Sequence, residues 1–421
     1  MNFSDVFALL TAFYLFVFLI RNNWVALPLI IFASQIELGF GRLINLPLSF
    51  SQLIFIISLF AYLLGKLFNR EKSKYVFANM DFWVLMFLIW IILGSIALQN
   101  LDFSSTGITR QISFVVTFFF AALIFKDHNE IRKATILWVL VSINLLFFQF
   151  FEAINLASDI RLYYGRNSLA LEMAISGIMA MMLGFDENRK NFKRFFFMLA
   201  FLFMIGIIIN TSRGVLIAFS VSAFILLIIR GVKVSKIILL GLIGVALFSL
   251  NSLIENNLYS NSIGRLLSTN VEEIENETRY VIWRAGMELA SQNPWFGVGV
   301  NNFQDQISIY GWENNIRSLT GGKSAHNMFV SIAVEFGLPG LFILLVIIAT
   351  GYKYIFQKIK MAHPDFAIIY PLLAALLVFT IEGFFADIHR MASFWMVFGL
   401  LKSVHRLSLS TIPRKEKNAS I

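Results

Sequence analysis

Cationic side chains gather in one long polar segment of an otherwise apolar chain. Residues 254–325 interrupt the apolar pattern and carry Arg265, Arg279, Arg284, Arg317 and Lys323, and His326 follows directly after them. A guanidinium group grips phosphate oxygens in a fixed fork geometry, and an imidazole exchanges a proton near neutral pH. These residue types predict that the polar segment holds the functional site, with anion binding and proton transfer as its chemistry.

Two of the arginines occupy settings that favour a bound anion. The pattern from Asn276 to Pro294 predicts an amphipathic helix that is capped by Asn276 or Thr278 and ends before the proline. Arg279 would then lie in the first turn, where free backbone N–H groups and the helix dipole attract phosphate. Arg213 stands in a tight break between two apolar helices. It either snorkels at the membrane interface or forms part of an anion site.

Arg284 is a third candidate on the same predicted helix. It follows Arg279 by five residues and therefore points to a different side of the helix. Tyr280, Trp283, Met287 and Ala290 share one face at helical spacing, which we expect to lie on the membrane or on the helix bundle.

His326 is one of 5 histidines and opens the helix predicted after the polar segment. A histidine at a membrane boundary is more often structural than catalytic, but its place beside the arginines favours proton transfer. No second histidine or acidic cluster stands at ligand spacing, so neither a metal nor another cofactor is expected. The chain contains no cysteine, which excludes disulfides and thiolate catalysis.

The elements that must position these residues are apolar helices. Of the 421 residues, 58% are hydrophobic and only 14% are charged, far from the composition of soluble domains. Many stretches approach the ~20 residues that cross a bilayer, where only internally bonded helices satisfy the backbone. The sequence predicts an all-α polytopic protein, with residues 1–421 as a single membrane domain and 254–325 as a large loop containing a helix. The first apolar stretch, 6–20, is expected to be retained.

Twelve or thirteen membrane helices are expected, depending on whether a break at Asn22 divides the first forty residues. The predicted spans are 4–21, 24–40, 49–68, 82–99, 112–125, 134–151, 168–184, 195–211, 214–230, 237–253, 327–350, 366–386 and 391–404.

Lysine and arginine are distributed unevenly between the two ends of these helices. Each predicted helix moves the chain to the other side of the membrane, and counting them places all the short basic segments on the same side. The positive-inside tendency assigns that side to the cytoplasm. These segments are 66–74, 126–133, 189–194, 230–236, 353–360 and 414–417. The break at Arg213 and the segment 254–325 then face outward, toward the periplasm in a bacterium. The net charge of +9 is explained by this orientation and needs no nucleic acid.

Several short motifs occur in a fixed order across residues 205–345. Thr211-Ser-Arg-Gly is followed by Arg279-Tyr-Val-Ile-Trp, Pro294-Trp-Phe-Gly-Val-Gly-Val-Asn-Asn-Phe, Ala325-His-Asn-Met-Phe and Glu335-Phe-Gly-Leu-Pro-Gly, with Gly165-Arg-Asn-Ser-Leu-Ala upstream. Their order and spacing resemble those of the bacterial O-antigen ligase and polysaccharide polymerase family, which has about twelve membrane helices.

The resemblance implies an inverting, metal-independent glycosyltransferase of the inner membrane with its active site on the periplasmic side. The donor would be a glycan on undecaprenyl pyrophosphate, and the acceptor would be lipid A–core in a ligase. Arg213 and Arg279 match the arginines of the family and would bind the pyrophosphate, with Arg284 as a further candidate. His326 matches its histidine and would activate the acceptor hydroxyl.

Two other functions stay open at this point. A repeat-unit polymerase shares the donor chemistry and differs in its acceptor, a second lipid-linked repeat unit, which the motifs do not identify. A flippase or transporter of lipid-linked sugars would carry charged residues within its helices, and Glu172 and Glu382 are the few candidates. The sugars, the linkage and the oligomeric state do not follow from the sequence.

Overall fold

The computed structural model describes residues 16–40, 50–69, 76–99, 107–153, 166–210, 212–233, 269–316, 320–361 and 367–411. Within these residues the fold is helical and contains no strand. The membrane-type helices of the first half are α2 (Ala26–Phe40), α3 (Phe50–Asn69), α4 (Asn79–Ala97), α5 (Ile108–Leu123), α6 (His128–Val141), α7 (Ile143–Ala153), α8 (Arg166–Asp186), α9 (Lys190–Asn210) and α10 (Arg213–Ile229). They are followed by α13 (Thr269–Gln292), α14 (Phe303–Glu313), α16 (Met328–Met361), α17 (Ile369–Glu382) and α18 (Ala392–Thr411), with short 3-10 helices η1 (Asn23–Val25) and η3 (Ile388–Arg390).

The described helices are those of a multi-pass membrane protein, as predicted. By length and composition, 6 stretches can cross a membrane, namely 50–67, 79–97, 128–150, 167–186, 190–210 and 328–360. Shorter apolar helices cover 23–36, 108–123, 213–229 and 369–382. The predicted break in the first forty residues is present at Asn22, between helical residues 16–21 and η1. Residues 4–15 and the predicted helix 237–253 lie outside the described residues, as does the first part of the segment 254–325.

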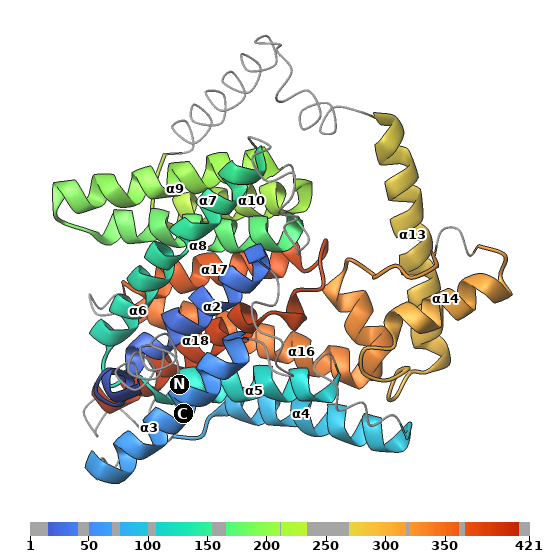
Figure 1. The fold of residues 1–421 in the computed structure, drawn as a ribbon, viewed down its shortest axis with the longest axis horizontal. Helices are drawn as coiled ribbons and strands as arrows, with labels where there is room; N and C mark the ends of the chain where they lie inside the picture. The colour runs from blue at the N-terminus through green and yellow to red at the C-terminus, as the bar shows by residue number, and fades with distance from the viewer. Residues whose placement is uncertain are drawn as a thin grey trace, which may run out of the picture.

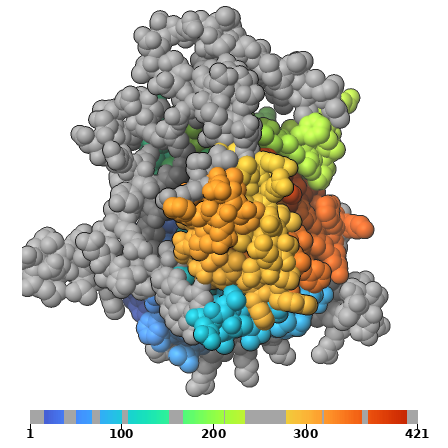
Figure 2. Space-filling view, turned by 90° about the vertical axis from the view of Figure 1, so that its right-hand side faces the viewer, coloured from blue at the N-terminus to red at the C-terminus, as the bar shows by residue number. Residues whose placement is uncertain are grey.

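The long helices run roughly alongside one another, and α13 and α14 lie across one of their ends (Figure 1). α17 packs against both α8 and α10, and α18 packs against α5. Viewed onto the end that carries them, α13 and α14 cover the centre of the face (Figure 2). This end is the one predicted to face outward.

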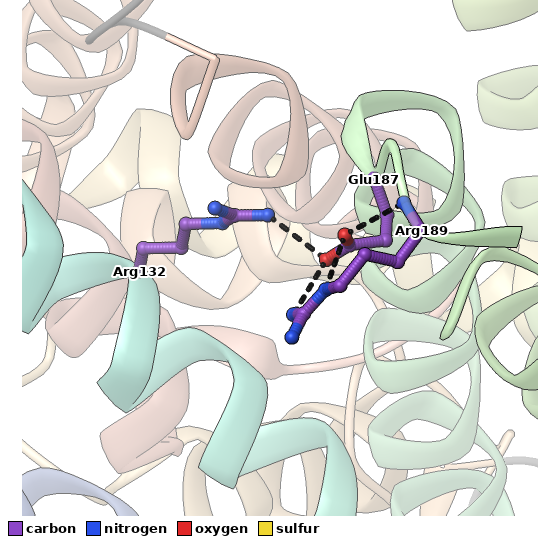
Figure 3. Close-up of polar contacts among 3 residues, drawn as sticks. All are labelled: Arg132, Glu187 and Arg189. Carbon is purple, nitrogen blue, oxygen red and sulfur yellow. Dashed lines mark hydrogen bonds and ion pairs between the residues drawn. The ribbon is translucent and has the colours of Figure 1, made fainter. Parts of the chain in front are cut away.

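At the opposite end an ion-pair cluster fixes the connection between α8 and α9 (Figure 3). The Glu187 side chain is only 6% exposed and accepts hydrogen bonds from Arg189 Nε at 3.0 Å and Arg132 Nη2 at 3.3 Å. The hydrogen bond from Arg189 lowers the pKa of Glu187 to about 2. The carboxylate therefore stays charged throughout the physiological range and ties α6 to the α8–α9 hairpin at the end predicted to be cytoplasmic.

Two predicted element boundaries are wrong, and one helix was missed. The single helix predicted over 134–151 is divided at Ser142, whose hydroxyl donates to the Trp138 carbonyl at 2.9 Å, a bond that disturbs a helix locally. α13 begins at Thr269 instead of near Asn276, since no glycine or proline interrupts the intervening residues. The helix α14 was not predicted at all.

A small apolar core explains α14 and its neighbours. Phe303 and Ile307 of α14 are buried together with Ile282, Ala285 and Leu289 of α13, and with Val330 and Val334 of α16. Of the predicted apolar face of α13, Ala290 is buried in this core, whereas Tyr280 and Met287 are 65% and 55% exposed and lie outside it. Burial of apolar side chains against α16 stabilises these elements outside the main helix bundle.

α16 is kinked in its first half, and the segment after α13 fills the kink. Gly337 is non-helical (φ 71) and Pro339 supplies no N–H, so the carbonyls of Val334 and Glu335 lack their helical donors. The N–H groups of Val298 and Gly299 donate to these two carbonyls at 2.8 and 3.1 Å. The motif that begins at Pro294 and the motif that begins at Glu335 are therefore held together by backbone hydrogen bonds, a contact that we call the backbone joint.

Glycine is required on both sides of this joint. A Cβ on Gly297 (φ 67) would lie 2.3 Å from Val334 O, and one on Gly337 would lie 2.1 Å from Trp295 O. We expect Gly297→Ala and Gly337→Ala to lower the thermal stability of the purified protein sharply or to prevent its accumulation. Gly322→Ala is the matched control, because Gly322 also has positive φ but nothing within 4 Å and should lose only about 1–2 kcal/mol. Equal losses in all three variants would contradict this account.

Candidate active site

The charge of the arginine in α13 acts on the end of α17. Arg279 is partly exposed and interacts electrostatically with Glu382, the last residue of α17. The Glu382 side chain is only 1% exposed. One turn further along α13, Trp283 Nε1 donates to the Ala325 carbonyl at 2.8 Å. The part of α13 that carries Arg279 is thus fixed against the residues that precede α16.

This placement corrects the predicted setting of Arg279. Because α13 begins at Thr269, Arg279 lies well inside the helix and not in its first turn. Backbone N–H groups at that position are bonded within the helix and are not available to an anion. Any anion affinity there comes from the guanidinium group itself and from the other cationic groups near it.

His326 lies in a turn that is held on both sides. Its backbone is left-handed (φ 47), and it precedes α16 instead of opening it as predicted. Asn327 caps α16, since its Oδ1 accepts from the N–H groups of Phe329 and Val330 at 3.0 and 3.2 Å. The Met328 N–H donates to the Gly383 carbonyl at 2.7 Å. The imidazole is therefore presented at the surface by a fixed backbone, next to the end of α17.

The start of α10 meets the same end of α17. A Cβ on Gly214 would lie 3.0 Å from Glu382 Oε2 and 2.8 Å from Phe385 Cβ, so only glycine permits this approach. Arg213, the first residue of α10, is partly exposed. The preceding Ser212 donates to Asn167 Oδ1 at 3.0 Å, which joins the upstream motif at the start of α8 to the motif at the start of α10.

Arg284 belongs to a different surface. It is exposed and its charge acts on Tyr310 of α14, whose hydroxyl donates to Glu288 Oε2 at 2.5 Å. The hydrogen bond to Glu288 raises the pKa of Tyr310. The structure thus does not bring Arg284 to the end of α17, where it places Arg279, the start of α10 and the turn of His326.

The segment between α17 and α18 is the part of the site that sequence reasoning missed. Beyond Glu382, Asp387 accepts from Ser331 Oγ at 2.5 Å, and Arg390 pairs with the fully buried Glu335. These contacts attach the segment to α16. A signal was present in the sequence. Asp387, His389 and Arg390 form a short polar break between two apolar helices, and counting the predicted helices along the chain places this break on the outer side.

The fold is a bundle of apolar helices with charged groups gathered at one end. This is the arrangement of a multi-pass membrane protein whose charged groups lie at the membrane surface. Residues 197–345 match the family model described as O-antigen ligase. This stretch contains α10, α13, α14 and the start of α16, and its similarity to the O-antigen ligase family is the resemblance that the motifs predicted. The family comprises glycosyltransferase-like enzymes of O-antigen assembly, which act on lipid-linked polysaccharides. No curated protein matches the chain.

Proposed function

We propose that the protein transfers a glycan from undecaprenyl pyrophosphate to lipid A–core at the periplasmic face of the inner membrane. The observation that carries this proposal is the convergence of three motifs on the end of α17. Gly214 abuts Glu382, Arg279 interacts with the same carboxylate, and the turn of His326 is bonded to Gly383. The elements that carry Arg213, Arg279 and His326 are thus related to one end of α17, which supports a common role for the three residues.

The arginines would serve the leaving group. When the bond between the sugar and the carrier breaks, both of its electrons stay with the pyrophosphate oxygen, and negative charge grows there. Preorganised guanidinium groups stabilise such charge, and charge-assisted bidentate hydrogen bonds are the strongest available. Arg213 and Arg279 would bind this oxygen and its neighbours without a metal. Arg284, which faces α14, would take no direct part in the reaction.

His326 would act on the acceptor. Its neutral imidazole takes the proton from an acceptor hydroxyl as the hydroxyl oxygen attacks the anomeric carbon. The new carbon–oxygen bond forms on the face opposite the departing pyrophosphate, so the configuration at that carbon is inverted. Undecaprenyl pyrophosphate leaves, and the imidazolium returns its proton to water.

The acceptor is tested by reconstitution. The purified protein in liposomes is given lipid-linked repeat units alone, or together with lipid A–core. A ligase forms glycosylated lipid A–core only when that acceptor is present and leaves the donor unextended in its absence. Longer carrier-linked chains formed from the donor alone would instead identify a repeat-unit polymerase. No product in either case would reject transfer from this donor.

The orientation is tested by labelling of single cysteines, because the parent chain has none. Gln292, at the end of α13, and Asn191, near the start of α9, are both exposed. With an impermeant thiol reagent on intact cells, we expect labelling of Gln292→Cys and protection of Asn191→Cys until the membrane is opened. The opposite pattern would overturn the periplasmic site.

A further inference from the structure

An indole N–H of α13 holds the residue that precedes His326. Trp283 Nε1 donates to the Ala325 carbonyl at 2.8 Å. Ala325 is only 1% exposed, and Trp283 packs partly buried against the small apolar core. Loss of the donor from a buried carbonyl costs more than the hydrogen bond itself, because water does not readily replace it. This bond therefore fixes the start of the His326 turn to α13.

The other side of the same turn is attached to different elements. The Met328 N–H donates to the Gly383 carbonyl of the segment after α17 at 2.7 Å, and Asn327 caps α16. His326 stands between these attachments and the bond to α13, with a left-handed backbone (φ 47). A non-glycine residue keeps such a conformation where the surrounding contacts impose it. Without the indole bond the turn would be released on the side of α13 and would stay attached to α16 and to the end of α17.

α13 does not depend on this bond for its own position. Ile282 and Ala285, on either side of Trp283, are both 2% exposed and belong to the same apolar core as Val330 of α16. Arg279 precedes Trp283 by four residues and lies on the same side of the helix. Loss of the indole N–H should thus move the turn of His326 and leave the helix that carries Arg279 in place.

We propose that Trp283 is a positioning residue that sets where the His326 imidazole stands relative to Arg279. The proposal rests on the proposed function, since it assigns Trp283 to the step in which His326 takes the proton of the acceptor hydroxyl. A displacement of about 1 Å in a reacting group can lower a rate about a hundredfold. Trp283 touches neither the donor nor the acceptor and acts through His326.

Trp283→Phe tests the bond, because phenylalanine keeps an aromatic ring in the apolar core and lacks the N–H. The measurement is glycan transfer by the purified full-length protein in liposomes. We expect kcat per folded molecule to fall about tenfold to a hundredfold. The KM for the lipid-linked donor and the affinity for inorganic pyrophosphate should stay close to those of the parent, since Arg279 does not move. If Trp283→Phe fails to accumulate, Trp283→Met takes its place, because methionine also lacks the N–H and fills irregular space in a core.

Trp90→Phe is the matched control. Trp90 Nε1 also donates to a backbone carbonyl at 2.8 Å, that of Phe336, but this bond lies at the kink of α16 and not beside His326. Each variant loses one indole hydrogen bond and should lose a similar amount of thermal stability, whereas only Trp283→Phe should lose kcat. Equal kcat values in the two variants, whether lowered or unchanged, would overturn the positioning role.

The double variant with Trp283→Phe and His326→Asn shows whether Trp283 acts through the imidazole. If it does, the double variant transfers glycan no more slowly than His326→Asn alone, because residues that act as a unit are not additive. Losses that multiply would give Trp283 a general structural role and overturn the proposal.

Two failures are distinguishable. A large loss of transfer in His326→Asn together with a parental kcat in Trp283→Phe overturns the positioning role alone. A parental rate in His326→Asn removes the base from the proposed function, and the role of Trp283 then falls with it.

Discussion

His326→Asn should reduce glycan transfer by about 10²–10⁴-fold, the usual contribution of a general base, while the protein accumulates and binds its donor normally. The choice of asparagine follows from the backbone, since His326 is left-handed (φ 47). Asparagine adopts this conformation more readily than most residues, so the turn between Ala325 and the Asn327 cap should persist. The measurement is the rate of transfer to the acceptor, divided by the amount of folded protein.

His326→Ala serves as the companion variant, because alanine removes the imidazole but also strains the left-handed backbone. If the imidazole is the base, both variants lose transfer to a similar extent and only the alanine variant loses stability as well. Transfer at the parental rate by His326→Asn would remove His326 from the chemistry. A defect confined to His326→Ala would assign the residue a purely structural role.

Replacing Arg213 or Arg279, the arginines proposed to bind pyrophosphate, by lysine should be nearly as damaging as removing the side chain. Lysine keeps the charge but lacks the planar fork that binds two phosphate oxygens at once. We expect Arg213→Lys and Arg279→Lys to lower the rate of transfer about a hundredfold or more, as the loss of one preorganised donor at a developing oxyanion does. The same assay should show weakened binding of undecaprenyl pyrophosphate in both variants.

Arg284→Lys is the internal control for this prediction. It lies on the same helix as Arg279, but it is exposed and faces Tyr310 of α14, so its rate should stay close to that of the parent. If all three lysine variants were equally impaired, the positive charge of the whole loop would matter more than a specific site. If Arg279→Lys were normal and Arg284→Lys impaired, the site would lie on the α14 side of α13.

The helices were predictable because the bilayer imposes their length and composition. α4, α8 and α10 begin and end within a few residues of the predicted spans. A run of apolar residues with polar or basic flanks leaves little choice of where a membrane helix can begin and end. α14 was missed for the opposite reason. Phe303 and Ile307 stand four residues apart, as on one face of a helix, but α14 has only 11 residues, and the burial of this face against α13 and α16 is visible only in the fold.

The candidate site was predictable in its residue types but not in its construction. Arg213, Arg279 and His326 were identified from motifs, yet the predicted reason for Arg279, the first turn of a helix, is wrong because α13 begins at Thr269. In the sequence, Glu382 was considered only as a charged residue within a helix, of the kind that a transporter would carry. Its relation to Gly214 and Arg279 depends on α10, α13 and α17 meeting in space, and no local pattern encodes such a meeting.

The backbone joint formed at Gly297 and Gly337 shows that a sequence motif can fix backbone geometry without taking part in a reaction. The segments after Pro294 and Glu335 look like one functional signature in the sequence. In the fold, Gly297 and Gly337 allow two backbones to approach and to satisfy the carbonyls freed by Pro339. The joint fixes the segment after α13 against the kink of α16.

The most direct test of the site is an experimental structure of the protein with undecaprenyl pyrophosphate bound. The account predicts the two phosphates between Arg213 and Arg279, with guanidinium nitrogens about 2.7–2.9 Å from phosphate oxygens, and the His326 imidazole facing the position of the sugar carbon. Phosphates bound elsewhere, for example beside Arg284 and α14 with Arg213 and Arg279 left without contact, would contradict it.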